Sequence, residues 1–187
     1  LKMALKWRVG RIVVDNLHEL NRLGQIAKEV GYKPTILLRL TPGIDPHTHQ
    51  YIATGVIDSK FGFSIFDGEA AVAQALSMPQ LNLVGFHFHL GSLLFEIEPY
   101  AAAIELVLRF AAEMKQKYGF ELRELDVGGG FAVQYTLDSP APPVSQYAAA
   151  ITDRVIRQCQ ELGLSRPRLI IEPGRAIVGQ AGVALYQ

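Results

Sequence analysis

Two histidines alternate with phenylalanines in the stretch Phe86–Ser92, FHFHLGS, and imidazoles at this spacing can do chemistry. Residues two apart on a strand share a face, so His87 and His89 point the same way. Three interpretations follow. The imidazoles bind a metal, they are core residues, or one of them packs on a flat cofactor whose phosphate is bound at Gly91 and Ser92. The stretch by itself leaves all three open.

Three consecutive glycines end a second strand-like stretch, DVGGG at residues 126–130. Glycine tolerates positive φ and lets backbone N–H groups come close to a ligand. The turn formed by Gly128, Gly129 and Gly130 is therefore a candidate phosphate cradle. A tight turn that needs no ligand is the other interpretation.

A carboxylate, a rigid turn and a guanidinium follow one another in Glu172, Pro173, Gly174 and Arg175. Arginine suits bidentate binding of phosphate or carboxylate. This polar group of residues is a second candidate anion site, and a local ion pair between Glu172 and Arg175 is the alternative.

Together the three motifs describe a site for pyridoxal 5′-phosphate. The glycine turn, the Ser92 hydroxyl and the Arg175 guanidinium would bind the phosphate, whereas the His89 imidazole and the Glu172 carboxylate would hold the ring. A carboxylate facing the pyridine nitrogen keeps that nitrogen protonated, so the ring can accept electrons.

A metal hydrolase is the rival interpretation. His87 and His89 form one H-x-H pair, and His47 and His49 form a second pair in the sequence PHTH. Zinc sites on barrels also need a carboxylate or a further histidine from another strand end. The second pair lies in a polar loop, where solvation explains it, and we predict no metal.

Apolar stretches alternate with helical patterns along the chain, which indicates parallel β/α units that position these residues. Asn16 and Ser145 are expected helix caps, and Gly31 and Gly119 are expected helix ends. The expected strands are 11–15, 35–40, 83–89, 122–127 and 168–172, and the expected helices are 16–31, 67–76, 99–119 and 145–162.

These strands are expected to form part of an eight-stranded TIM barrel. With a period of two, the last inward residues of three strands are Arg39, His89 and Glu172. Polar tips from several strands are typical of the carboxyl face of a barrel, whereas an open doubly wound sheet gathers its ligand at one switch point. A whole barrel needs about 250 residues. The predicted fold class is therefore α/β, a partial (β/α)8 barrel with about five of its eight strands present.

The composition argues against nucleic acid and membranes as binding partners. The chain has 187 residues, 49% of them hydrophobic, with 18 basic and 18 acidic side chains. Zero formal charge gives no general attraction to nucleic acid or to an anionic membrane surface, and no apolar run reaches the length of about 20 residues that spans a membrane. The single cysteine, Cys159, falls on the apolar stripe of an expected helix, so we expect it in the core of a protein from a reducing, cytoplasmic compartment.

The motifs HxHxGS, LDVGGG and EPGR, at these spacings, resemble those of the fold-type III pyridoxal-phosphate decarboxylases. Within that family, the segments 51–63, 118–130 and 172–182 resemble most closely the diaminopimelate decarboxylases. The resemblance covers nearly the whole chain and implies an alanine racemase-like barrel that binds pyridoxal phosphate.

The resemblance implies roles for single residues. His89 stacks on the cofactor ring, Glu172 pairs with the ring nitrogen, and Arg175 also reaches a substrate carboxylate. Arg39 matches a strand-end arginine near the ring, and Lys60 lies in a loop over the site. The other residues implied to bind the cofactor are Ser92, Gly128, Gly129, Gly130, Pro173 and Gly174.

The implied reaction is decarboxylation of an amino acid, with meso-diaminopimelate giving L-lysine and carbon dioxide. The expected partners are this small substrate and a second copy in a homodimer. An arginine- or ornithine-type decarboxylase of the same fold is one alternative. A non-enzymatic barrel that carries pyridoxal phosphate is another.

Two features of the family are missing from this sequence. The Schiff-base lysine stands in a Tyr-Ala-x-Lys motif on the first barrel strand, and neither Lys2 nor Lys6 has that context. The carboxyl-terminal β domain is also missing. We expect residues 1–178 to be part of the barrel and 179–187 to begin that domain, and we expect the 187-residue piece alone to be inactive. Leu93 replaces a glutamine that often follows HxGS.

Overall fold

A parallel sheet carries the described part of the chain, which in the computed structural model comprises residues 1–44, 61–183 and 185. The strands are β1 (Ile12–Val14), β2 (Thr35–Thr41), β3 (Phe63–Ser64), β4 (Asn82–His87), β5 (Glu124–Asp126) and β6 (Arg168–Ile170). The helices are α1 (Lys2–Lys6), α2 (Leu17–Val30), α3 (Gly68–Leu76), α4 (Glu98–Tyr118), α5 (Val144–Glu161) and α6 (Gly174–Val178).

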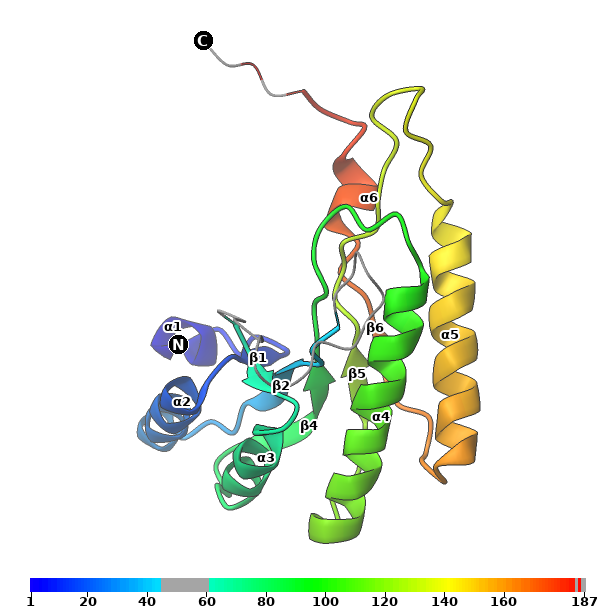
Figure 1. The fold of residues 1–187 in the computed structure, drawn as a ribbon. Helices are drawn as coiled ribbons and strands as arrows, with labels where there is room; N and C mark the ends of the chain where they lie inside the picture. Colours follow the sequence, from blue (N-terminus) through cyan, green and yellow to red (C-terminus); the bar gives the residue numbers. More distant parts are fainter. Residues whose placement is uncertain (45–60, 184, 186–187) are drawn as a thin grey trace.

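The strands follow one another around the sheet in chain order, β1-β2-β4-β5-β6, and β3 pairs with β2 beside this path. Every pairing is parallel. A doubly wound sheet reverses direction at a switch point, and no reversal occurs among the described strands. Figure 1 shows α2, α3, α4 and α5 covering one side of the sheet. Sequential order with helices on one side is the arrangement of a barrel wall, so the expected partial barrel is confirmed.

Helix ends follow the predicted capping residues in two of the helices. The Asn16 side chain accepts a hydrogen bond from the Glu19 amide at 2.9 Å and caps α2. Gly31 and Gly119 end α2 and α4 in the left-handed conformation, with φ of 68° and 67°. The predicted cap of α5, Ser145, was wrong by two residues, because the N-cap is Pro143. The Gln146 amide bonds to the Pro143 carbonyl at 2.9 Å, so the helix starts at Val144 and Ser145 lies inside it.

Two of the strands, β4 and β6, end earlier than predicted, but their ladders continue. β4 stops at His87 and β6 at Ile170, two residues short of the predicted ends. Beyond them the Phe88 amide bonds to the Asp126 carbonyl at 3.0 Å, and the Glu172 amide to the Gly128 carbonyl at 2.8 Å. These bonds hold the predicted tips in line with the strands.

Apolar side chains fill the space between the sheet and its helices. Leu38, Phe86 and Leu125 point to this side and are fully buried against α3, α4 and α5. Cys159 is also buried there, which confirms the prediction of a core cysteine. None of the helices in the described ranges is long and apolar enough to cross a membrane.

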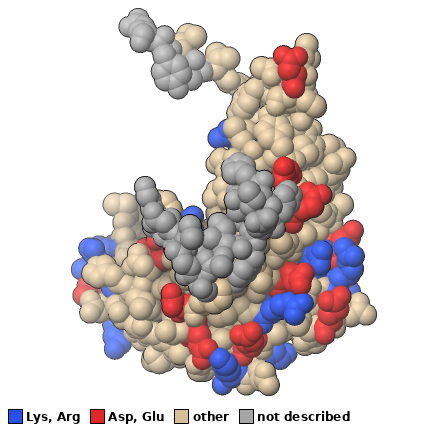
Figure 2. Space-filling view, viewed as in Figure 1, with Lys and Arg blue, Asp and Glu red and all other residues tan. Residues whose placement is uncertain are grey.

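Charged side chains of both signs are mixed on the molecular surface. Figure 2 shows blue and red side chains side by side over the lower part of the face. Several form exposed ion pairs, such as Lys115 with Glu121 at 3.1 Å and Arg109 with Glu105 at 2.8 Å. Exposed pairs of this kind stabilise a fold little, at about 0–1 kcal/mol each.

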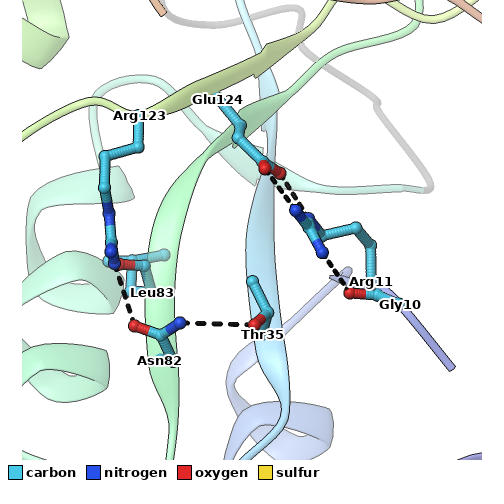
Figure 3. A network of polar contacts seen from close by, with 7 residues as sticks. All are labelled: Gly10, Arg11, Thr35, Asn82, Leu83, Arg123 and Glu124. Atoms are coloured by element: carbon cyan, nitrogen blue, oxygen red, sulfur yellow. Dashed lines mark hydrogen bonds and ion pairs between the residues drawn. The ribbon is translucent and has the colours of Figure 1, made fainter. Parts of the chain in front are cut away.

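An ion pair bridges the concave side of the sheet, opposite the helices. Arg11, just before β1, donates two hydrogen bonds to the Glu124 carboxylate on β5 (Figure 3). β2 and β4 lie between these strands in the sheet, so the contact requires the sheet to curl. Gly85 lets β4 pack closely against the backbone of Glu124 on β5. A Cβ at Gly85 would lie 1.7 Å from the Glu124 carbonyl oxygen.

We predict that Arg11→Met destabilises the protein by about 1–2 kcal/mol in urea unfolding. The Glu124 side chain is only 9% exposed, so it would keep a buried charge without its partner. The loss is small because the Arg11 side chain is 37% exposed and solvent screens its charge. Arg22→Met, at an exposed arginine of α2, is the matched control and should leave the urea concentration at the midpoint of unfolding unchanged.

The same pair predicts a pH dependence. The hydrogen bond from Arg11 lowers the pKa of the Glu124 carboxyl from its usual value. A carboxyl with a lowered folded-state pKa contributes stability above its unfolded pKa and loses it as the pH falls through the folded value. The stability gap between the native protein and Arg11→Met should thus be full at neutral pH and should close below about pH 4. A gap that stays constant through acid titration would contradict this assignment.

Candidate active site

Strand register places polar side chains in rows on the concave face. Arg39 on β2 pairs in register with His87 on β4, and His87 with Asp126 on β5. Residues in register point to the same side of a sheet, and positions two further along do so again. The next row therefore contains His89 and Glu172, at the carboxyl ends of β4 and β6.

These rows line a cavity of about 440 Å³, a size typical of small-molecule sites. Arg39, His89 and Glu172, the three tips selected from sequence, all line it. The other residues that line it are Val13, Asp15, Glu19 and His87. A larger hollow of about 910 Å³ runs along α1 and α2 and shares Asp15 and Glu19, but it contains none of the three tips.

Glu172 lies at the centre of the contacts at this end of the sheet. One oxygen of its carboxylate is 3.7 Å from Nε2 of His87. Its side chain is 52% exposed, so it remains accessible from the cavity. Its amide is bonded to Gly128, which ties it to the glycine turn.

His89 is oriented by the glycine turn. The Gly129 amide donates to Nδ1 of His89 at 3.4 Å. Nδ1 is therefore an acceptor, which leaves Nε2 as the nitrogen that can donate. The imidazole lines the same cavity as Glu172 and contacts the glycine turn.

The glycine turn packs too closely for side chains. A Cβ at Gly129 would lie 2.0 Å from the Glu172 carbonyl oxygen, and a Cβ at Gly130 would lie 2.0 Å from the Gly91 carbonyl oxygen. The hydroxyl of buried Tyr100 donates to the Gly129 carbonyl at 2.7 Å and fixes the turn from below. The amides of Gly128 and Gly129 already bond to protein acceptors, so these two glycines shape the turn.

The phosphate-binding residues expected from sequence lie near this turn but outside the cavity. Gly91 packs on Gly130, and this places Ser92 on the adjoining loop, where it is exposed. Pro173 precedes α6, while Gly174 and Arg175 begin it, and Arg175 is exposed. None of these side chains lines the cavity described above.

Some predicted residues lie outside the described part of the chain. His47 and His49 of the second H-x-H pair fall in the range 45–60, as do Ser59 and Lys60 of the predicted loop over the site. Phe61 and Gly62, which follow them, are described.

Asp15 is a site residue that the sequence analysis did not identify. Its Oδ1 accepts from the Gly62 amide at 3.0 Å and lies 3.5 Å from Nη1 of Arg39. The Arg39 guanidinium in turn lies 5.0 Å from the centre of the Phe61 ring. Asp15 thus anchors residues 61–62 to the cavity. Its position at the end of a predicted strand was the available signal.

Asp126 is the second residue that was missed. It is buried beside His87, and its Oδ1 accepts from the Gly128 amide at 2.9 Å. A ring nitrogen of His87 and one carboxylate oxygen each of Asp126 and Glu172 all lie within 4.8 Å of one another. Period-two alternation along its strand assigns Asp126 only to a face, and its place beside His87 follows from the register of the two strands.

Burial sets the protonation of these groups. It lowers the pKa of His87 to about 4, so the imidazole is neutral at physiological pH. It raises the pKa of Asp126, an effect that the Gly128 amide and His87 partly oppose and the neighbouring Glu172 carboxyl reinforces.

A family model, curated sequences and solved structures all show that this chain is similar to pyridoxal-dependent decarboxylases. The family model for the pyridoxal-binding domain of pyridoxal-dependent decarboxylases matches residues 1–179. The diaminopimelate decarboxylases of Bacillus methanolicus and Bacillus subtilis are 42% and 40% identical to this chain over its whole length, which spans 44% and 43% of theirs. The crystal structure of the M. jannaschii diaminopimelate decarboxylase with L-lysine matches 94% of this chain and 40% of its own, at 31% identity and a TM-score of 0.85. The chain thus spans less than half the length of these relatives.

We predict that Gly129→Ala destabilises the protein by about 1–3 kcal/mol in urea unfolding, because the new methyl group must displace the Glu172 backbone. Gly174→Ala is the matched control from the neighbouring motif. A Cβ at Gly174 meets nothing within 4 Å. The free energy of unfolding of Gly174→Ala should therefore stay within about 0.5 kcal/mol of the native value. Equal effects at the two positions would show that the close packing of the turn is not required.

Proposed function

Because this chain belongs to the family of pyridoxal-dependent decarboxylases, we propose that the whole protein removes carbon dioxide from an amino acid with pyridoxal 5′-phosphate as its cofactor. The observation that carries this proposal is the meeting of His89, Glu172 and the glycine turn at one end of the sheet. The bound cofactor supplies a protonated aromatic ring that accepts the electron pair left when the carboxyl group departs.

The cavity suits a flat ring with one nitrogen. It offers an accessible carboxylate in Glu172 and an imidazole in His89 that the Gly129 amide orients. Its volume of about 440 Å³ falls within the range of about 300–1,000 Å³ for small-molecule sites. The donor set therefore fits the cofactor that the family binds.

Glu172 would hold a proton on the ring nitrogen. An anionic carboxylate at hydrogen-bond distance favours the protonated form of a pyridine, since opposite charges stabilise each other at low dielectric. His89 would cover one ring face. Its orientation comes from the Gly129 amide, so the imidazole need not reorganise when the ring enters.

Hydrogen-bond donors and one cation would bind the anionic groups of the cofactor and the substrate. We assign Ser92, Gly130 and Arg175 to the phosphate, and Arg175 also to a substrate carboxylate. Gly128 and Gly129 hold the turn, and Pro173 and Gly174 carry the chain into α6. Arg39 also lines the cavity, and its guanidinium forms an ion pair with Asp15.

We propose meso-diaminopimelate as the substrate and L-lysine as the product. The support is the identity of 40–42% with diaminopimelate decarboxylases over the whole chain. We further propose a homodimeric cytoplasmic enzyme. Residues 1–178 would belong to its barrel and residues from 179 onward to a second domain, a boundary that agrees within one residue with the family match over residues 1–179.

We predict that the full-length protein, supplied with pyridoxal 5′-phosphate, releases carbon dioxide from meso-diaminopimelate at least about 100-fold faster, by kcat/KM, than from arginine or ornithine. A site that binds polar groups of its substrate rejects analogues that leave those groups unpaired. Radiometric carbon dioxide release with each amino acid is the measurement. Release from arginine or ornithine alone would overturn the substrate assignment, and release from none would overturn the proposed reaction.

A further inference from the structure

Three ionisable side chains form a layer at the floor of the cavity, and the roles assigned above use only one of them. His87 and Asp126 are 5% and 4% exposed, and Glu172 rises from them toward the cavity. Nδ1 of His87 is buried and has no hydrogen-bond partner among the described residues. A layer this buried and this polar requires a charge balance.

The cations near this layer do not balance it. Within the described residues no lysine or arginine forms an ion pair with Asp126 or Glu172. Arg39 faces His87 from β2, but its guanidinium is paired with Asp15 at 3.5 Å. His87 itself is neutral, because burial lowers its pKa to about 4. Two adjacent ionised carboxylates would therefore repel each other without compensation.

A shared proton resolves the imbalance. Oδ1 of Asp126 accepts from the Gly128 amide, so Oδ2 is the oxygen left to carry a proton. Burial and the adjacent Glu172 carboxyl both raise the pKa of Asp126, whereas the Glu172 side chain is 52% exposed to solvent. The proton therefore belongs on the deeper of the two groups.

We propose that Asp126 is a protonated carboxylic acid at neutral pH that donates a hydrogen bond to Glu172 and so positions that carboxylate, as an anion, toward the cofactor ring nitrogen. Asp126 touches neither cofactor nor substrate in this arrangement and acts through Glu172. This inference rests on the proposed function for the identity of the ring, but the protonated acid itself does not depend on the cofactor.

If Asp126 is protonated, asparagine should replace it better than an apolar side chain does. In Asp126→Asn the amide oxygen can accept from Gly128 while the amide nitrogen donates to Glu172, as a protonated acid does. Asp126→Leu has similar volume but can do neither. If Asp126 were instead an anion paired with a metal or with a charged His87, asparagine would fail as leucine does.

Infrared spectroscopy of the full-length protein without cofactor tests the proton directly. We expect a carbonyl band of a protonated carboxylic acid at pH 7 that is lost in Asp126→Asn. The band should persist in Asp15→Asn, since Asp15 is a strand-end carboxylate paired with Arg39. Absence of the band from the native protein, or its survival in Asp126→Asn, overturns the proposal whether or not the protein is a decarboxylase.

Titration with pyridoxal 5′-phosphate tests the positioning role. We expect Asp126→Asn to bind within tenfold of the native affinity and Asp126→Leu to lose more than tenfold. The bound cofactor's absorption should also change in the native protein as alkaline pH ionises Asp126, and this transition should vanish in Asp126→Asn. The groups that face the layer, which are His87, His89, Glu172, Arg39 and Asp15, are unchanged between these proteins.

Each outcome decides the question. A loss of more than tenfold in Asp126→Asn, an unchanged alkaline transition in that variant, or one equivalent of zinc by elemental analysis overturns the proposal. Failure of the native protein to bind the cofactor would refute the proposed function instead, and the infrared result would still stand.

Discussion

The parallel register of β4, β5 and β6 is the constraint on which the site depends. It pairs His87 with Asp126 and Asp126 with Ile170, so the next inward positions bring His89 and Glu172 together at the strand ends. A slip of one residue would turn each of these side chains toward the helices. The backbone pairing therefore sets the chemistry of the cavity before any side chain contacts another, and the close-packed glycine turn then locks the ends in place.

Much of this architecture could be predicted from the sequence because its signals are local. Alternation along the strands and glycine at helix ends gave the order of elements, and the caps at Asn16, Gly31 and Gly119 are as expected. Period-two alternation also selected Arg39 and His89 as inward tips, which both line the cavity. These patterns involve few residues and are little affected by tertiary packing.

The features that the sequence did not reveal are set by tertiary contacts or are too short to show a period. α1 and α6 have five residues each and β3 has two. Asp126 was read as part of the glycine motif, and its pairing with His87 becomes evident only from the register of two strands. Asp15 was missed because its partners, Arg39 and Gly62, lie 24 and 47 residues away.

The proposed function depends most on Glu172, whose carboxylate should face the ring nitrogen of the cofactor. Nitrogen-15 NMR of the full-length protein, loaded with pyridoxal 5′-phosphate labelled at the ring nitrogen, reports the protonation of that atom directly. We predict a protonated nitrogen in the native protein and an unprotonated one in Glu172→Gln, because only the anion stabilises the added proton. An unprotonated nitrogen in the native protein, or a signal that is the same in both, would contradict the claim.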